Sequence, residues 1–359
     1  MLLPSFLKMP IYAFELSDES FKYLRMRQQK GGMMVIEDFG EGAIAPGVID
    51  RGEIKKPDIL KSLLKELFLK KNIKFVAISL PEEKGFLRNV KLKGAKEEEV
   101  RSSLELQLEE HIPLPPQEVV FDYAIVNKEK EHFDVVINAF PRVIVGSYLD
   151  VFAAAGATPA LVESELGAMV EAVIPKNFVA SAMIIDWGKT RTSFAIAKNR
   201  ILRFASTVPI GGKALDEAIA KNLKVDKKEA EALKIKHGFS PASPSQGGQT
   251  PESLPSFQAI VPIVTALREE AERYINFWQT HSEDKKAPEL IFLTGGDANL
   301  IGLTDYLQSE LGIPTILANP WANVIFPRYY LPELEKRGAI RFAASVGLAI
   351  KALDKENIL

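Results

Sequence analysis

One local pattern occurs in both halves of the sequence, and it limits the possible folds more than any other feature. An apolar run ends on an acid at Glu15 and again at Asp186, and each acid is followed by a short polar corner and another strand-like run. A nearly continuous apolar run at Phe75–Leu80 is typical of a buried strand, and the chain returns to a strand at Leu290–Leu293. The repetition predicts two related α/β halves.

Helical spacing of apolar residues predicts helices around these strands. The predicted helices are 57–68, 97–112, 142–155, 263–279, 300–311 and 340–353. The block from about Pro81 to Ala155 also holds strand-like runs at 119–123 and 133–137, so we expect a small α+β insertion there. The Ser- and Pro-rich segment 240–256 has little to bury and predicts a flexible surface loop.

The composition excludes several classes of function. Lys and Arg number 45 and Asp and Glu 47, so the near balance gives no support to nucleic-acid binding. The absence of cysteine excludes disulfides and thiolate zinc sites, and the 4 histidines lack the spacing of a histidine-rich metal centre. No apolar stretch reaches the roughly 18 residues that span a bilayer, and the N-terminus lacks the basic start of a secretory signal, so we expect a cytoplasmic protein.

The segment 184–194 is the strongest candidate for chemistry. A hydrophobic strand delivers Asp186, Gly188 permits a tight turn, and Thr190 and Thr192 add hydroxyls at the tip of a hairpin. Backbone N–H groups in such a turn can bind an anion, and the acid can hold Mg²⁺ through water. An ordinary β-hairpin with a glycine turn is the alternative.

A second candidate is the pair Gly295-Gly296, which stands between a buried strand and a predicted helix. Glycine lets the backbone approach a flat ligand closely, and the start of the helix can bind an anion. A plain strand-to-helix turn has the same pattern.

A third candidate combines a glycine-rich helix entry with charges on the next helix. Gly212 and Lys213 lead into one helix, and Glu231 and Lys234 share a face of the following helix. The alternative is a solvent-exposed ion pair.

The corner after Glu15 is a weaker candidate for a phosphate site. It contains Ser17, Ser20 and Lys22, but it has no glycine and three acids between Glu15 and Glu19. Like charges about 4 Å apart cost about 1 kcal/mol in water and about 4 kcal/mol at an effective dielectric constant of 20.

The order and spacing of these segments resemble the actin-like ATPase superfamily and, within it, the PilM-type proteins of type IV pilus assembly, which are similar to FtsA. The resemblance covers about Tyr12 to Ala352, and the stretch 111–123 is its most specific part, because other actin-like ATPases lack that insertion. The other supporting stretches are 79–81 with Phe86 and Arg88, 154–157, 163–165, 311–314, 318–320 and 344–349.

The resemblance implies an α/β fold of the actin-like type. Two RNase H-like halves, subdomains 1A and 2A, would enclose a nucleotide cleft, with an α+β 1C insertion of the SHS2 type and a helical/β 2B subdomain. The implied boundaries are 1–80, 156–180 and 339–359 for 1A, 81–155 for 1C, 181–212 and 285–338 for 2A, and 213–284 for 2B.

The resemblance also implies that ATP and Mg²⁺ bind in the cleft, with Asp186 facing the metal. The implied nucleotide-binding residues are Ser17, Ser20, Lys22, Gly188, Thr190, Thr192, Gly212, Lys213, Glu231, Lys234, Gly295, Gly296 and Asn299. Two departures stand out: Glu15–Ser17 replaces the family's Asp-Ile-Gly, and Asp297 stands where a third glycine or another small residue is usual. We expect Lys189 and Arg191 to compensate partly by attracting phosphates. The sequence thus predicts ATP binding without efficient hydrolysis, and no catalytic residue is assigned.

In function, the resemblance implies a cytoplasmic scaffold of a type IV pilus or a related type II secretion-like machine, at the inner face of the membrane. In PilM-type proteins the N-terminal tail of the inner-membrane protein PilN binds in a groove between 1A and 1C, and ties the alignment complex to the motor. We expect a PilN-like partner here, contact with the membrane only through it, and no nucleic acid; a homo-oligomer is a further possibility. Phe86–Arg88 is a candidate groove edge, with a core strand as the alternative.

Two other functions stay open at this point. The first is a sugar or acetate-type kinase on the same fold, which would need a base near the acceptor hydroxyl and an intact first phosphate turn. The second is an FtsA-like membrane-associated filament protein, which normally has a basic amphipathic C-terminal helix.

Overall fold

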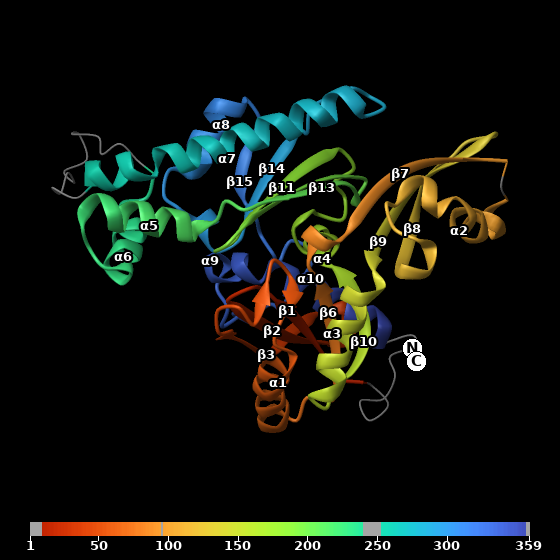
Figure 1. Ribbon diagram of the computed structural model, residues 1–359, viewed down its shortest axis with the longest axis horizontal. Coiled ribbons are helices and arrows are strands. Elements are labelled where there is room, and N and C mark those ends of the chain that lie inside the picture. The colour runs from red at the N-terminus through yellow and green to blue at the C-terminus, as the bar shows by residue number, and fades with distance from the viewer. Residues whose placement is uncertain (1–8, 95, 240–252, 357–359) are drawn as a thin grey trace.

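The computed structural model describes residues 9–94, 96–239 and 253–356 (Figure 1). The apolar start of the chain and residues 240–252 of the expected surface loop lie outside these ranges. The loop prediction is wrong for its last residues, because 253–256 already belong to a helix. No helix in the described ranges is long and apolar enough to cross a membrane.

Two five-stranded sheets have the same strand order and the same directions, so the predicted duplication is confirmed. In each sheet three antiparallel strands are followed by two parallel ones, in the orders β3-β2-β1-β6-β10 and β13-β12-β11-β14-β15. The strands of the first sheet are β1 (Ile11–Leu16), β2 (Ser20–Gln28), β3 (Met34–Ala43), β6 (Phe75–Leu80) and β10 (Thr158–Ser164). Those of the second are β11 (Ser181–Trp187), β12 (Thr192–Lys198), β13 (Ile201–Val208), β14 (Leu290–Thr294) and β15 (Thr315–Leu317).

Two helices, α4 (Glu165–Val173) and α10 (Ala343–Glu356), lie between the sheets. Their apolar side chains share one core with inward-facing residues of both sheets, such as Ala13 and Ile184. The helices cross very closely at Gly347, where an added Cβ would lie 1.7 Å from the carbonyl oxygen of Ala168. Only glycine permits this approach. The two sheets are thereby joined through a single packed layer formed by α4 and α10 (Figure 1).

The outer face of the first sheet is covered by α1 (Pro57–Lys71) and α3 (Arg142–Ala154). Side chains at alternate positions of the strands, such as Phe14, point to this face and pack on Phe68 of α1 and Phe152 of α3. The insertion predicted over 81–155 includes α3, whereas the side chains of α3 pack in the core of the first sheet. We therefore propose that the inserted unit ends near Pro141. The first sheet with α1 and α3 is called the first lobe below.

The second sheet carries its helices on its own outer face, and together they form the second lobe. These helices are α5 (Gly212–Leu223), α6 (Lys227–His237), α7 (Ser253–His281) and α8 (Leu303–Leu311). The sequence predicted α7 only from Ile263, but the helix begins ten residues earlier, at Ser253, and continues through Pro262. The short helix α9 (Lys336–Ala339) then leads the chain back to α10.

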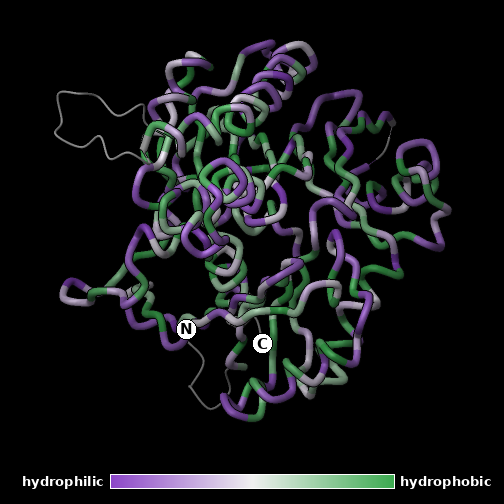
Figure 2. The backbone as a smooth tube through the Cα atoms, turned by 60° about the vertical axis from the view of Figure 1, so that its left-hand side comes forward, coloured by the Kyte–Doolittle hydropathy of each residue, from purple (hydrophilic) through white to green (hydrophobic). Residues whose placement is uncertain are grey.

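The insertion forms a third, smaller sheet with a core of its own. Its strand order is β7-β9-β8, and α2 packs on one face through residues such as Leu104 and Leu108. The elements are β7 (Phe86–Lys93), α2 (Val100–His111), β8 (Val119–Lys128) and β9 (His132–Pro141). A short hairpin, β4 (Ile49–Asp50) and β5 (Glu53–Ile54), lies in the first lobe. Figure 2 shows hydrophobic residues along the inner strands and hydrophilic residues at many outer turns.

Candidate functional site

A cavity of about 640 Å³ lies where the two lobes face each other. Its walls come from the β1–β2 corner, the β11–β12 hairpin, the turn after β14 and helix α6. Ten of the fourteen predicted ligand-binding residues line it: Ser17, Ser20, Lys22, Asp186, Gly188, Thr190, Glu231, Lys234, Gly295 and Gly296. The topology places these segments together because both sheets direct the same ends of their strands towards the cavity.

The β1–β2 corner is held by bonds within itself. The Ser17 backbone N–H donates to the carbonyl of Ser20 at 2.8 Å, and the two hydroxyls lie 2.9 Å apart. Lys22 Nζ lies 2.6 Å from Glu15 Oε1. Burial lowers the pKa of Lys22, but the adjacent Glu15 carboxylate outweighs this and raises the pKa overall. This lysine is therefore charged but already neutralised by its neighbour.

Glycines set the shape of the second hairpin and of the turn beside it. The Gly188 N–H donates to the carbonyl of Arg191 at 3.0 Å, which closes the hairpin. Gly295 has φ +93°, and an added Cβ there would lie 2.3 Å from the carbonyl oxygen of Trp187. This contact brings the end of β14 against Asp186, whereas a Cβ on Gly296 would have no atom within 4 Å. Gly296 therefore borders open space in the cavity.

Three of the predicted residues make other contacts instead of lining the cavity. Thr192 is fully buried and donates its hydroxyl to the carbonyl of Ile210 at 2.5 Å. Gly212 donates its N–H to Gly188 O at 3.0 Å, and Asn299 donates its side-chain amide to the carbonyl of Arg337 at 3.1 Å. The backbone groups at the start of α5 are thus used to hold the hairpin.

Lys213, the fourth such residue, lies outside the main cavity. Its Nζ lies 2.7 Å from Glu19, and it lines a neighbouring cavity of about 610 Å³. Its backbone N–H donates to Lys189 O at 2.9 Å, so it also fixes the β11–β12 hairpin.

Lys234 is buried between two carboxylates. Its Nζ lies 2.8 Å from Asp216 and 2.6 Å from Asp297. Burial lowers its pKa, but the two acids outweigh this and raise it. Asp297 also fills the space over Gly212, where an added Cβ would lie 1.7 Å from its carboxylate. Asp297, which departs from the family pattern, thus holds a lysine that the resemblance implies for nucleotide binding. The alternative of a solvent-exposed pair of Glu231 with Lys234 is wrong for the lysine, which is buried.

Three acidic residues from different elements meet at the floor of the cavity: Glu15 of β1, Glu165 of α4 and Asp186 of β11. Burial, followed by the charges of Glu165 and Glu15, raises the pKa of Asp186 from 3.8 to about 8. Burial also raises the pKa of Glu165, and its Oε2 accepts no hydrogen bond from the described residues. These groups repel one another unless a proton or a cation is present.

Arg191 joins the two lobes through three carboxylates. Its guanidinium lies 3.3 Å from Asp18, 3.2 Å from Glu83 and 3.6 Å from Glu165. Burial lowers the pKa of the Arg191 guanidinium, but the three acids outweigh this and raise the pKa overall. The group is therefore always charged. The sequence led us to expect that Arg191 attracts phosphates. The three carboxylates of the protein compete strongly with a phosphate for this guanidinium.

The sequence matches the family described as type IV pilus assembly protein PilM over residues 14–353. The chain belongs to the PilM family. It is also 28% identical over 240 residues to the cell shape-determining protein MreB of Escherichia coli K12, covering 56% of this chain and 69% of MreB. The family match favours pilus assembly over the kinase and FtsA-like alternatives.

Solved structures show the same actin-like fold. The PilM–PilN type IV pilus biogenesis complex superposes with a TM-score of 0.79 at 22% identity, covering 96% of this chain and 99% of that chain. MreB5 of Spiroplasma citri bound to ADP gives 0.53 at 14% identity, with 98% of each chain covered. The predicted actin-like fold and the PilM-type resemblance are thus confirmed.

A magnesium ion fits this PilM cleft only with water or phosphate as further ligands. No three acidic or histidine side chains in the described ranges converge closely enough to hold a metal alone. Mg²⁺ usually keeps several waters and takes one or two carboxylates plus phosphate oxygens. The unsatisfied Glu165 oxygen and the raised pKa of Asp186 fit a nearby cation of this kind.

Sequence reasoning missed Glu165, Asp216 and the partners of Arg191 as residues of the PilM cleft. Glu165 begins α4, and Ser164 before it caps the helix by accepting the Gly167 N–H at 3.0 Å. A serine followed by an acid at a helix start was therefore a usable signal. The partners Asp18 and Glu83 come from distant segments, and only the packed lobes bring them to Arg191.

Proposed function

We propose that this PilM-family protein is a cytoplasmic scaffold of type IV pilus assembly, or of a related type II secretion-like machine, and that it binds ATP with Mg²⁺ between its lobes. The observation that carries the proposal is the 640 Å³ cavity in which both repeated hairpins and the Gly295-Gly296 turn meet. A fold neighbour, MreB5 of Spiroplasma citri, was solved bound to ADP. Pockets of about 300–1,000 Å³ are typical for small ligands and cofactors.

The residues around the cavity suit different parts of a nucleotide. Asp186 would hold Mg²⁺ through water, and bound Mg²⁺ would neutralise charge on the phosphates. The hairpin tip at Lys189 and Thr190 would offer backbone N–H groups to the phosphates, and the Thr190 hydroxyl, which donates to Asp18 Oδ2 over a long 3.4 Å, could turn to them. Gly296 and Glu231 border the side of the cavity where the nucleoside would lie.

We propose that hydrolysis is inefficient. The first phosphate turn has no glycine, and its serine hydroxyls bond each other at 2.9 Å. Most cations of the cleft are held by carboxylates: Lys22, Lys234, Arg191 and Arg341 each have an acidic partner within 3.3 Å. Among the cavity-lining residues described, Lys189 is the cation without an ion pair in these ranges. Preorganised positive charge, on which phosphoryl transfer depends, is therefore scarce.

The nucleotide proposal is tested by thermal unfolding with and without Mg·ATP. The intact protein should show a higher Tm with Mg·ATP, since a ligand that binds only the native state stabilises it. Asp186→Ala should remove most of this shift, whereas Asn299→Ala, outside the cavity, should keep it. An intact protein without any shift at millimolar Mg·ATP would refute nucleotide binding.

For the partner, we propose the cytoplasmic N-terminal tail of a PilN-like inner-membrane protein, bound between the first lobe and the insertion. The match to a solved PilM–PilN complex supports the partner class. Phe86–Arg88 lies at the edge of the insertion sheet, and Leu87 packs against the central core, so this segment lies where the insertion joins the lobes. Through such a partner the scaffold would connect the membrane complex to the pilus motor.

The partner proposal is tested with the N-terminal peptide of a PilN-like inner-membrane protein. The peptide should bind the full chain, and a scrambled peptide of the same composition should not. Failure of both peptides to bind a folded protein would refute the partner while leaving the nucleotide proposal intact.

A further inference from the structure

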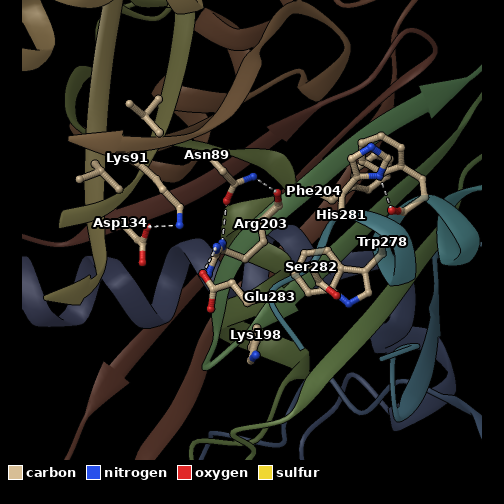
Figure 3. Close-up of a pocket in the computed structure, with 13 residues that line it drawn as sticks. Asn89, Lys91, Asp134, Lys198, Arg203, Phe204, Trp278, His281, Ser282 and Glu283 are labelled. Atoms are coloured by element: carbon tan, nitrogen blue, oxygen red, sulfur yellow. Dashed lines mark hydrogen bonds and ion pairs between the residues drawn. The ribbon is translucent and has the colours of Figure 1, made fainter. Parts of the chain in front are cut away.

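A separate pocket of about 240 Å³ lies between the insertion and the second lobe, away from the nucleotide cleft (Figure 3). The insertion contributes residues of β7 and β9, and the second lobe contributes β12, β13 and the end of α7. The lining residues used below are Asn89, Lys91, Arg203, Phe204, Phe277 and Trp278. We call it the junction pocket.

One wall of the junction pocket is aromatic. The rings of Phe204 and Phe277 have centroids 5.4 Å apart, and Phe277 stacks on His281 at 4.2 Å. Trp278 is buried, and its indole N–H has no hydrogen-bond partner in the described ranges. Phe277 is 46% exposed, which is unusual for a side chain of this size at a lobe junction. The wall therefore presents apolar surface to the pocket.

The opposite side holds two cations whose carboxylate partners are distant. Arg203 lies 3.7 Å from Glu283, and Lys91 lies 4.0 Å from Asp134, both beyond ordinary hydrogen-bond length. The Arg203 side chain is only 11% exposed, whereas Glu283 is 53% exposed. A buried guanidinium with a loose, solvated partner favours a better-placed carboxylate, which it can bind in bidentate fashion.

The backbone edge of β13 is closed at this point. Asn89 donates its amide to the Arg203 carbonyl at 2.8 Å and accepts from Arg203 Nε at 2.7 Å, as Figure 3 shows. A guest strand therefore cannot pair with β13 here without breaking this contact. Recognition must come from side chains, and 240 Å³ suits one or two side chains rather than a nucleotide.

We infer that the junction pocket binds a segment of a partner protein in which an aromatic residue is followed by an acidic one. The aromatic ring packs on Phe204, Phe277 and Trp278, and the carboxylate reaches Arg203 and Lys91. Charge complementarity selects an acidic over a basic segment. The junction pocket lies between the insertion and the second lobe, whereas the groove proposed for the PilN-like tail lies between the insertion and the first lobe.

The experiment uses the full chain and three capped octapeptides, which contain Phe-Asp, Phe-Lys or Ala-Asp at the centre of an otherwise identical Gly/Ser sequence. Binding is measured by calorimetry and by tryptophan fluorescence, with Trp278→Phe as the control that separates Trp278 from the emission of Trp187 and Trp321. We expect the Phe-Asp peptide to bind with Kd below about 1 mM and to shift the tryptophan emission, and the other two to bind at least about 5-fold more weakly. Equal binding of the Phe-Asp and Phe-Lys peptides, or none by any of them, would overturn the inference.

Variants place the interaction at the junction pocket. Lys91→Glu should weaken the Phe-Asp peptide by about 3-fold to 10-fold and improve the Phe-Lys peptide, while Lys93→Glu, exposed on the same strand but outside the pocket, should change neither. Arg203→Gln should abolish the preference for the Phe-Asp over the Phe-Lys peptide. Because the Phe277 side chain is exposed, Phe277→Ala provides a second variant of the pocket that keeps the fold. The PilN-like tail should bind Lys91→Glu normally; competition between that tail and the Phe-Asp peptide would overturn the claim of a second site.

Discussion

Replacing Gly347 by alanine tests the packing that joins the two lobes. The new methyl carbon would lie 1.7 Å from the carbonyl oxygen of Ala168, where ordinary contact needs roughly 3.5 Å. Helices α4 and α10 would have to separate by roughly 2 Å, in a core where Ala168 is fully buried. Overpacking usually costs about 1–3 kcal/mol, and a clash with backbone that cannot rotate away belongs at or above the upper limit. We therefore expect the free energy of unfolding to fall by about 3 kcal/mol or more.

The assay is thermal unfolding of Gly347→Ala beside a matched glycine. With an unfolding entropy of about 2.1 cal/mol/K per residue over 359 residues, about 3 kcal/mol corresponds to a fall in Tm of roughly 4 °C. Gly146 in α3 is also helical, and an added Cβ there meets no atom within 4 Å, so Gly146→Ala should raise stability by up to about 1 kcal/mol. The close crossing would be refuted by a Gly347→Ala variant with the Tm of the parent.

Three further predictions concern the cleft. Because the pKa of Asp186 rises from 3.8 to about 8 on folding, the native state holds a proton between these pH values that the unfolded state releases; stability therefore falls as the pH rises from about 4 to about 8 and levels off above, and Asp186→Asn should flatten the fall in Tm between about pH 5 and 8. Arg191→Met leaves buried carboxylates without their cation, so we expect the free energy of unfolding, measured in urea, to fall by about 3–5 kcal/mol. A fall of less than about 1 kcal/mol would show that water replaces the arginine. Asp297→Gly removes a carboxylate from Lys234 and restores the residue usual in the family; Mg·ATP titration should show a lower Kd, and unchanged affinity would mean that Asp216 alone keeps the lysine occupied.

The fold was predictable because local patterns and topology agree. Apolar runs of strand length, each ending in a polar corner, occur twice, and a repeated pattern of this kind has few compact solutions. The predicted boundaries are wrong where tertiary packing overrides a local sequence pattern. Pro262 reads as a helix start in the sequence, yet α7 continues through it, packed on the second sheet. The helix at Arg142 reads as part of the insertion because it follows β9 directly, yet its apolar face packs on the first sheet.

The candidate site was predictable only in its backbone. Glycines and hairpins reveal where a chain turns, and ten predicted residues do line one cavity. Side-chain pairing depends on distances between segments that are far apart in the sequence. Lys234 shares a helix face with Glu231, but its partner Asp297 lies 63 positions away, and no periodicity connects the two. For the same reason Arg191 was expected to attract phosphates, whereas three acids from other segments surround it.

The charges of the cleft determine what this PilM-family protein can bind there. Burial strengthens every ion pair, so Lys22 and Lys234 are costly to remove from their carboxylates. An anion that entered alone would meet Glu15, Glu165 and Asp186, with Lys189 as the unpaired cation among the described cavity-lining residues to balance them. A divalent cation changes this, because it offsets the acids and supplies the positive charge that the paired side chains withhold. If the cleft binds a nucleotide as proposed, the same residues would make that binding depend on the metal and leave little free positive charge for hydrolysis, which would suit a scaffold that senses Mg·ATP more than one that consumes it.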